Sequence, residues 1–419
     1  MRIAYPFSAI VGQDDMKLAV LIAAVEPGIG GVLAFGAPAS AQKKYGPQGV
    51  SDTEIKIGQT MPHSGPVSIY GVMGRVHQAY FDMVNEKGGI NGRKITFISA
   101  DDAFSPPKTV EQTRKMVEND GVFMLFGSSS TAGQSAVQKY LNSKKVPQLM
   151  LSTGASKFND PKNFPWTTPI LQTYSTEGEV YAKWLMETKP DAKVAILMQN
   201  DDFGRDYIKG FKDKLGPKAA TMIVKEATFE VVDPTVDSQI LALKASGADV
   251  LFSASLGKTT AQVLKKLSEI DWKPMTLIVS NSVSQPVLLA AGLDNAKGII
   301  TATGTKRSGD PANEKDPGVA AYIAFMKKYL PKEDPVNEIG FSAYSWATVL
   351  EKLLRDCGDE LTPENILAKA TNMKNVTAPA LMEGVTYNTT PTDYAPLKKL
   401  VIQQFDGQVW KPIRAVTVE

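Results

Sequence analysis

Short apolar runs alternate along the chain with longer segments in which apolar residues recur at helical spacing. In EIKIGQTMP, residues 54–62, Ile55 and Ile57 alternate with polar residues, which is typical of a β-strand. Between Met73 and Val84 the apolar residues follow the period of an amphipathic helix. Because strands and helices follow one another in this way, we predict an α/β fold with parallel sheets and helices on both faces.

The alternation falls into two series, which an irregular stretch at residues 155–173 separates. The first series predicts strands at 54–62, 93–102, 121–127 and 146–153, with helices at about 73–84, 107–120 and 132–144. The second predicts strands at 192–201, 220–230, 248–255 and 275–282, with helices at 175–189, 206–216, 235–247 and 259–270. Later residues predict helices at 317–330 and 340–356 and a final strand at 398–410. Two such series predict two lobes, one of residues 54–172 plus about 303–380 and one of 173–302 plus about 381–419.

Polar loops follow four of the predicted strands, at residues 127–131 (GSSST), 153–156 (TGAS), 200–202 (NDD) and 280–282 (SNS). Open parallel sheets bind ligands outside the carboxyl ends of their strands. Because these loops come from both series, we expect them to border one cleft between the two lobes.

The N-terminus predicts a signal peptide over residues 1–41. An apolar stretch follows Met16, and Ala39-Ser40-Ala41 has the small side chains that signal peptidase requires, so we expect cleavage near Ala41 and export to the periplasm. Glu26-Pro27 interrupts the apolar stretch, which argues against a membrane anchor. The start codon is either Met1 or Met16.

The composition is that of a globular protein, with 43% hydrophobic and 21% charged residues. A net charge of +2 without clustered basic residues gives no electrostatic footprint for nucleic acid. Two histidines and one cysteine allow neither zinc-type spacing nor a disulfide. We therefore expect no cofactor and no metal, and we interpret Cys357 as a buried or half-buried apolar residue.

The GSSST loop does not fit a catalytic serine. The strained elbow of serine hydrolases needs G-x-S-x-G, and Thr131 stands at the last position. Neither histidine suits a general base, because His63 precedes a Gly-Pro turn and His77 lies in a helix, where we expect it to be partly exposed. A Ser–Lys pair stays open, although no S-x-x-K occurs near the loop. Phosphate-binding glycine motifs are missing, and GGINGR at 88–93 is interpreted as a tight turn.

Two pairs of acids, at 101–102 and 201–202, stand at strand ends before helices. Aspartates in such places most often cap helices or brace loops, and no further ligands converge on them. Capture of an anion remains the best interpretation of GSSST. The first N–H groups of the following helix and the serine and threonine hydroxyls suit a carboxylate, and Ser130 or Thr131 can cap the helix at the same time.

Three segments carry a family resemblance: EIKIGQTMPHSGPVSIYG, NEKGGINGRKITFISADDAFSPPKTVEQTRKMV and VPQLMLSTGASKFND. They resemble the branched-chain amino-acid-binding family, the type I periplasmic solute-binding proteins of ABC importers, over residues 54 to about 300. The resemblance implies two Rossmann-like lobes joined by three crossovers and closing on the ligand like a hinge. It implies a monomer that is not an enzyme and that delivers its ligand to an ABC permease in the inner membrane.

The resemblance also implies site residues. Family members hold the ligand carboxylate with two loops of the first lobe, and the tyrosine of an earlier loop and an aromatic residue of the second lobe line the pocket. The matching residues here are Ser129, Ser130, Thr131, Gly154, Ala155, Ser156, Tyr70 and Phe203, with Ser280 and Asn281 at the position that faces the ligand ammonium.

The chain departs from the family at that last position. Amino-acid binders place an acid there, and Ser280 and Asn281 are uncharged, although Asp201 or Asp202 could substitute. The family's first-lobe disulfide is also missing, with Phe104 in place of one cysteine. Because an unpaired ammonium is costly to bury, we favour a small apolar or aromatic carboxylate over a branched-chain amino acid. A ligand-sensing regulator on the same fold is the alternative.

Overall fold

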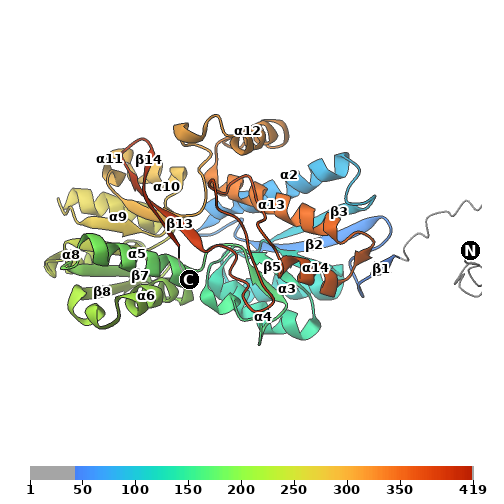
Figure 1. The fold of residues 1–419 in the computed structure, drawn as a ribbon, viewed down its shortest axis with the longest axis horizontal. Helices are drawn as coiled ribbons and strands as arrows, with labels where there is room; N and C mark the ends of the chain where they lie inside the picture. The colour runs from blue at the N-terminus through green and yellow to red at the C-terminus, as the bar shows by residue number, and fades with distance from the viewer. Residues whose placement is uncertain (1–42, 418–419) are drawn as a thin grey trace, which may run out of the picture. The chain divides into compact units, whose positions relative to one another are not determined.

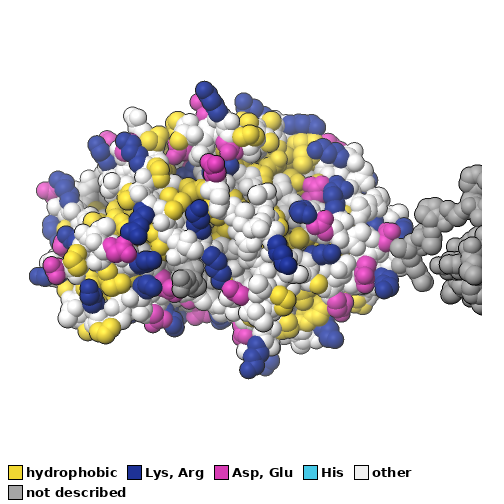
Figure 2. All heavy atoms as spheres, viewed as in Figure 1, with side chains coloured by type: hydrophobic (Ala, Val, Ile, Leu, Met, Phe, Trp, Pro, Cys, Tyr) yellow, Lys and Arg dark blue, Asp and Glu magenta, His cyan; other side chains and the backbone are white. Residues whose placement is uncertain are grey.

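The computed structural model describes residues 43–417, which contain two separate large sheets (Figure 1). The predicted signal peptide and both candidate start codons lie outside the described residues. Among the described helices, none combines the length and the hydropathy that a membrane crossing requires. On the face shown in Figure 2, lysine and arginine side chains are interspersed with acidic ones rather than gathered in one patch.

The first sheet has five parallel strands in the order β3-β2-β4-β5-β6. Its strands are β2 (Glu54–Met61), β3 (Lys94–Asp101), β4 (Met124–Phe126), β5 (Gln148–Leu151) and β6 (Thr167–Pro169). Its helices are α2 (Val72–Glu86), α3 (Pro106–Lys115), α4 (Thr131–Lys144), α12 (Pro317–Tyr329), α13 (Glu338–Asp356) and α14 (Pro363–Ala370). Short strands β1 (Lys44–Tyr45) and β12 (Glu360–Leu361) pair in parallel.

Side chains of alternate residues in β4 enter cores on opposite faces of this sheet. Met124 and Phe126 pack in the core that includes α2 and α13. Leu125 packs on the other face, with residues of α4 and of the helical turn Met116–Asp120 that follows α3. Successive strand residues point to opposite faces, so a strand covered by helices on both sides must be apolar throughout. This explains why β4 is a continuous apolar run.

The second sheet has seven strands in the order β14-β13-β11-β10-β9-β7-β8, in which β13 runs antiparallel to both of its neighbours, β11 and β14. The strands are β7 (Val194–Gln199), β8 (Ile223–Phe229), β9 (Val250–Ala254), β10 (Met275–Ile278), β11 (Ile300–Thr303), β13 (Lys399–Phe405) and β14 (Trp410–Thr417). The helices are α5 (Tyr174–Thr188), α6 (Asp202–Leu215), α7 (Ala219–Met222), α8 (Asp237–Ala245), α9 (Gly257–Glu269), α10 (Gln285–Ala291) and α11 (Leu293–Ala296). Helices α5 and α6 pack in one core with alternate residues of β7, and α8, α9 and α10 pack in another with the residues between, so helices cover both faces of this sheet (Figure 1).

The chain passes between the two sheets three times: between β6 and α5, between β11 and α12, and just before β13. The core of the first sheet includes Leu381, Tyr387 and Leu397, so this core extends beyond residue 380 before the last crossing.

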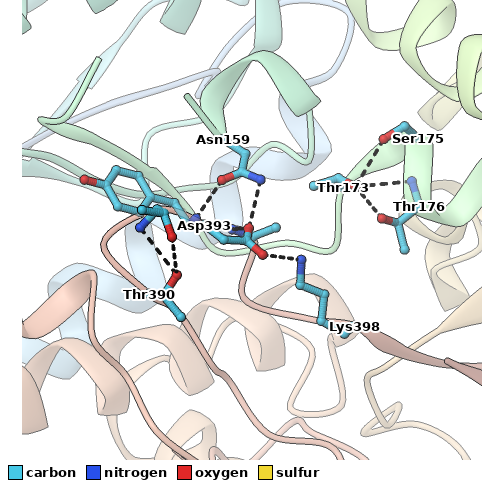
Figure 3. Close-up of polar contacts among 10 residues, drawn as sticks. Asn159, Thr173, Ser175, Thr176, Thr390, Asp393 and Lys398 are labelled. Carbon is cyan, nitrogen blue, oxygen red and sulfur yellow. Dashed lines mark hydrogen bonds and ion pairs between the residues drawn. The ribbon is translucent and has the colours of Figure 1, made fainter. Parts of the chain in front are cut away.

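Hydrogen bonds anchor two of these crossings (Figure 3). Asn159 Nδ2 donates to Asp393 Oδ1 at 2.9 Å, and Lys398 pairs with the same carboxylate at 2.7 Å. Thr173 Oγ1 caps α5 by accepting from the N–H of Thr176 at 3.2 Å. These hydrogen bonds therefore hold the first and the last of the three crossings in place.

The order of the main elements agrees with the prediction, but the last strand does not. The predicted strand 398–410 is a hairpin, because the carboxylate of Asp406 accepts from the N–H groups of Gln408 and Val409 and Gly407 has a φ of 105°. Both features belong to a tight turn. The predicted strand at 275–282 ends at Ile278, and a 3₁₀ helix, η6 (Ser280–Ser282), follows it.

Candidate functional site

A cavity of about 140 Å³ is lined by loops that follow strands of both sheets. One water needs only about 10–15 Å³, so the cavity can hold a small molecule. Ser129, Ser130, Thr131 and Ser152 line it from the first sheet, Leu256, Ser280, Asn281 and Val283 from the second, and Gln172, Thr305, Lys306 and Arg307 from the crossings. Its position at the carboxyl ends of parallel strands is where this architecture binds ligands.

The Ser129–Thr131 loop presents hydrogen-bond donors to the cavity. Ser130 caps α4, because its Oγ accepts from the N–H of Gly133 at 3.0 Å. Within the described residues, the N–H groups of Thr131 and Ala132 have no hydrogen-bond partner. Ser130 has a φ of 82°, which is uncommon for a residue with a side chain and is one of the backbone features that cluster at functional sites. The loop can therefore accept an anion without supplying a charge of its own.

The predicted second half of the anion site, Gly154–Ser156, does not line the cavity. A side chain at Gly154 would meet the backbone oxygen of Gln172 at 2.2 Å, so this glycine permits close packing of the crossing. The backbone N–H and Oγ of Ser156 both donate to Asp206 of α6, at 2.7 and 3.0 Å. The carboxylate of Asp206 therefore accepts the two hydrogen bonds that Ser156 could otherwise donate to a ligand. A ligand contact for Gly154, Ala155 or Ser156 stays a prediction.

Direct contacts connect the two lobes around the cavity. Besides Ser156 and Asp206, Lys157 forms an ion pair with Asp202 at 3.0 Å. Tyr70 Oη donates to the backbone oxygen of Asn281 at 2.9 Å. Burial raises the pKa of Asp206, and the hydrogen bonds from Ser156 act in the opposite direction.

Aromatic side chains form one wall of the cavity. The ring of Phe203 meets Tyr174 edge to face at 5.1 Å, and Tyr174 stacks on Tyr207 at 4.5 Å. Burial raises the pKa of Tyr174 to about 12, which the hydroxyls of Thr153 and Thr131 partly oppose. The aromatic wall therefore lies next to the hydroxyl groups of the Ser129–Thr131 loop.

Seven of the predicted residues therefore line the same cavity, although the structure does not test whether they bind a ligand. They are Tyr70, Ser129, Ser130, Thr131, Phe203, Ser280 and Asn281. Of the predicted substitutes for the missing acid, Asp201 lines the cavity but caps α6 through the N–H of Gly204 at 3.2 Å. Asp202 is paired with Lys157.

Sequence reasoning missed Glu177, a fully buried acid behind Ser280. The backbone N–H and Oγ of Ser280 donate to its two carboxylate oxygens at 2.6 and 2.7 Å. Tyr181 Oη, Gln172 Nε2 and Tyr207 Oη donate to the same group at 2.8, 3.2 and 3.2 Å. Burial raises the pKa of Glu177, and these donors oppose the rise. A signal existed in the sequence, since Glu177 lies one turn from buried Tyr181 on the apolar face of its helix.

Glu338, at the start of α13, was also missed. It lines the cavity, and its Oε2 accepts from the backbone N–H of Gln285 at 3.2 Å and lies 3.9 Å from Nε of Arg307. Burial raises the pKa of Glu338 to about 7, against the opposing charge of Arg307. A first-turn glutamate behind a capping asparagine is ordinary for a helix, so only the tertiary structure distinguishes it.

The raised pKa of Glu338 predicts a pH-dependent stability. Between the usual value of 4.5 and about 7 the folded protein binds a proton here that the unfolded chain has released. The contribution of this group to stability is therefore fully present below about pH 4.5 and is lost as pH rises to about 7. We expect the difference in free energy of unfolding between wild type and Glu338→Gln to fall by up to about 3 kcal/mol over this interval.

Urea unfolding of both proteins at several pH values measures this difference. Using the difference removes the contributions of the other acids, several of which have lowered pKa values and change in the opposite direction. A difference that stays constant with pH would show that Glu338 titrates as an exposed carboxyl does.

His77 is buried, contrary to the expectation of partial exposure. Its Nδ1 lies 2.8 Å from Nε2 of Gln59 and its Nε2 lies 3.1 Å from the backbone oxygen of Ala343. Burial lowers the pKa of His77 to about 3, so the imidazole is neutral and connects β2 to α13. The described residues contain no cluster of His, Cys, Asp and Glu that could hold a metal ion. Cys357 is buried and free.

Comparison with known proteins identifies the family. Residues 54–418 match the model of the family described as periplasmic binding protein. The chain is 25% identical to the Leu/Ile/Val-binding protein BraC3 of Rhizobium johnstonii over 88% of this chain and 95% of that protein.

Solved structures show the same fold. A branched-chain amino-acid ABC transporter protein from Thermus thermophilus with bound valine superposes with a TM-score of 0.79 at 17% identity, over 88% of this chain and 98% of that one. A solute-binding protein from Rhodopseudomonas palustris BisB5 in complex with 3,4-dihydroxybenzoic acid has a TM-score of 0.72 at 18% identity, over 87% and 97%. The chain therefore belongs to the periplasmic binding protein family and has its type I fold, with two Rossmann-like lobes joined by three crossovers.

Proposed function

We propose that this protein is exported to the periplasm and captures a small carboxylate-bearing solute with an apolar or aromatic body for an ABC importer. The family binds solutes and is not a class of enzymes. The observation that carries the proposal is the Ser129–Thr131 loop, which lines the cavity beside the aromatic wall. It carries the unpaired N–H of Thr131 and the hydroxyls of Ser130 and Thr131, and the Thr131 hydroxyl also bonds to Thr153 Oγ1 at 2.7 Å. Valine and dihydroxybenzoic acid, the ligands of the two structural neighbours, both carry a carboxylate.

Hinge closure is the mechanism that we propose. A ligand that contacts both lobes stabilises the closed arrangement by its difference in affinity for the closed and open states. The contacts of Tyr70 with Asn281 and of Ser156 with Asp206 would form in the closed arrangement and add to it. An ABC permease would then recognise the closed surface.

The environment of Ser280 favours a carboxylate over an α-amino acid as the ligand. In family members an acid meets the ligand ammonium at this position. Here the acid next to Ser280 is Glu177, and each of its two carboxylate oxygens already accepts a hydrogen bond from Ser280. An ammonium at this point would have to displace Ser280, so this end of the cavity, next to Ser280, offers it no ready partner.

The double variant Ser130→Ala/Thr131→Val tests the carboxylate site. Hydrogen bonds to a charged group contribute about 1.5–3 kcal/mol each, so we expect the affinity for the best-binding carboxylate to fall by about a hundredfold or more. Isothermal titration calorimetry with benzoate, aliphatic carboxylates and leucine measures it. Loss of the Ser130 cap should cost about 1 kcal/mol of stability, which leaves the protein folded.

Thr362→Ala is the matched control. Thr362 caps α14 through the N–H of Asn365 at 3.2 Å and does not line the cavity. It should lose a similar amount of stability and keep full affinity. Unchanged affinity in the double variant would rule out the loop as the carboxylate site.

A further inference from the structure

A second polar group of side chains lines the cavity, and the proposed function does not use it. Glu338 comes from the first lobe and Ser284 from the second, where it precedes α10. The N–H of Gln285, the residue after Ser284, donates to Glu338 at 3.2 Å. The two residues therefore lie at one point of the lobe interface. Neither shares a hydrogen-bond partner with the Ser129–Thr131 loop.

The charges at this point do not balance. Arg307 is buried, lies 3.9 Å from Glu338, and interacts electrostatically with both Glu338 and Asp310. Its Nη1 donates to Oε1 of Gln403 and its guanidinium stacks over the ring of Trp410. One guanidinium thus faces two carboxylates. Lys306 forms an ion pair with Asp316 at 2.6 Å. Among the described residues, no lysine or arginine besides Arg307 forms an ion pair with Glu338 or Asp310. Burying two acids with one base disfavours the ionised form of one of them, and burial raises the pKa of Glu338 to about 7.

Ser284 is the second observation that points to a ligand. The residue lines the cavity and is only 8% exposed, and its Oγ is buried with no hydrogen-bond partner within the described residues. Buried hydroxyls are nearly always paired, because an unpaired one loses its bonds to water. Ser284 heads α10 but does not cap it, so the hydroxyl has no structural task in the helix.

We propose that Glu338 and Ser284 form a second polar subsite, which takes an amine carried by the ligand at a distance from its carboxylate. This inference rests on the proposed function, because it places the ligand's carboxylate at the Ser129–Thr131 loop. The implied ligands are amino-carboxylates in which an apolar body separates the two groups. Ile339 and Trp346 of α13 line the same cavity and can cover such a body.

An amine would stabilise the ionised form of Glu338. Its ammonium supplies the positive charge that Arg307 alone does not, and it donates hydrogen bonds to the free oxygen of Glu338 and to Ser284 Oγ. Burial and the nearby charges of Asp310 and Asp334 raise the pKa of Glu338, while Arg307 and the N–H of Gln285 lower it. A bound ammonium favours the ionised carboxyl, so binding of the amine should strengthen as pH rises through about 7.

Calorimetry with matched ligand pairs tests the subsite. The pairs are γ-aminobutyrate with butyrate, δ-aminovalerate with valerate, ε-aminocaproate with caproate, and para-aminomethylbenzoate with para-toluate, with leucine as an α-amino acid. In wild type we expect at least one amino-carboxylate to bind about tenfold or more tightly than its partner. Glu338→Gln should abolish this preference and leave the affinity of the unsubstituted carboxylate within about threefold.

Ser284→Ala separates a ligand contact from a structural role. Because its hydroxyl has no hydrogen-bond partner among the described residues, this variant should keep or raise the melting temperature while the amine preference falls severalfold. Glu364→Gln, an exposed acid of α14, is the control and should change neither quantity.

The outcomes distinguish the two proposals. If unsubstituted carboxylates bind, depend on Ser130 and Thr131, and gain nothing from an amine, the second subsite is wrong and the proposed function stands. A preference that survives in Glu338→Gln also overturns the subsite. If no carboxylate of either kind binds to wild type, both proposals fail.

Discussion

Replacing Glu177 with alanine is expected to lower the free energy of unfolding by about 3–5 kcal/mol. The carboxylate has no exposed surface and accepts five hydrogen bonds, of which two come from Ser280. Removing it leaves buried donors without an acceptor, and each unpaired group costs about 1–3 kcal/mol. The cost is limited because some donors can turn to one another, as Tyr181 can to Thr301.

Glu177→Gln should cost less, about 1–3 kcal/mol. The amide keeps the shape and one accepting oxygen, but its NH₂ faces donors that it cannot satisfy. Both variants should also weaken ligand binding, because Ser280 lines the cavity and loses the group that fixes its side chain and backbone.

Urea unfolding and calorimetry measure the two effects. Glu179→Ala, on the same helix but partly exposed and without a side-chain hydrogen bond, is the control and should stay within about 0.5 kcal/mol of wild type. A loss for Glu177→Ala as small as that of the control would show that water replaces the carboxylate.

The fold could be predicted from the sequence because its signal is local. Alternating and helical apolar patterns depend only on spacing, and strand–helix alternation restricts the sheets to parallel ones. The same logic placed the Ser129–Thr131 loop at a strand end, and that loop does line the cavity. The hairpin of β13 and β14 was missed because the turn at Asp406-Gly407 interrupts the apolar pattern for only a few residues.

The acids near the cavity could not be predicted in the same way. Glu177 and Glu338 both lie in the first turn of a helix, where glutamate is common and usually exposed. The burial of Glu177 depends on packing against Ser280 and Tyr207 of its own lobe, and that of Glu338 on packing against Gln285 of the other lobe. Ser156 is the opposite case. The family resemblance predicts that it binds the ligand's carboxylate, but it donates to the carboxylate of Asp206, a residue fifty positions away.

Close contact between α5 and α6 leads to the second large effect. The helices approach through Gly178 and Gly210. A Cβ atom at Gly210 would lie 2.1 Å from the backbone oxygen of Ser175, and one at Gly178 would lie 2.3 Å from that of Tyr207. Backbone atoms cannot rotate away as a flexible side chain can, so the helices themselves would have to move apart.

Gly210→Ala is therefore expected to lower the free energy of unfolding by about 3 kcal/mol, near the upper end for overpacked sites. In an exposed helix the same change would stabilise by about 1 kcal/mol, so the clash decides the sign. Lys214→Ala, exposed on the same helix, is the control and should change stability by less than about 0.5 kcal/mol.

The displacement caused by Gly210→Ala should also reach the cavity. Helix α6 carries Phe203 of the aromatic wall and Asp206, the partner of Ser156. Moving this helix away from α5 separates Phe203 from Tyr174 and weakens the contact between the lobes. We therefore expect affinity for the best-binding carboxylate to fall together with stability, by about tenfold, when calorimetry is done at a temperature where the variant is folded. Full affinity with lowered stability would show that α6 and its cavity residues keep their position and that the strain is relieved elsewhere.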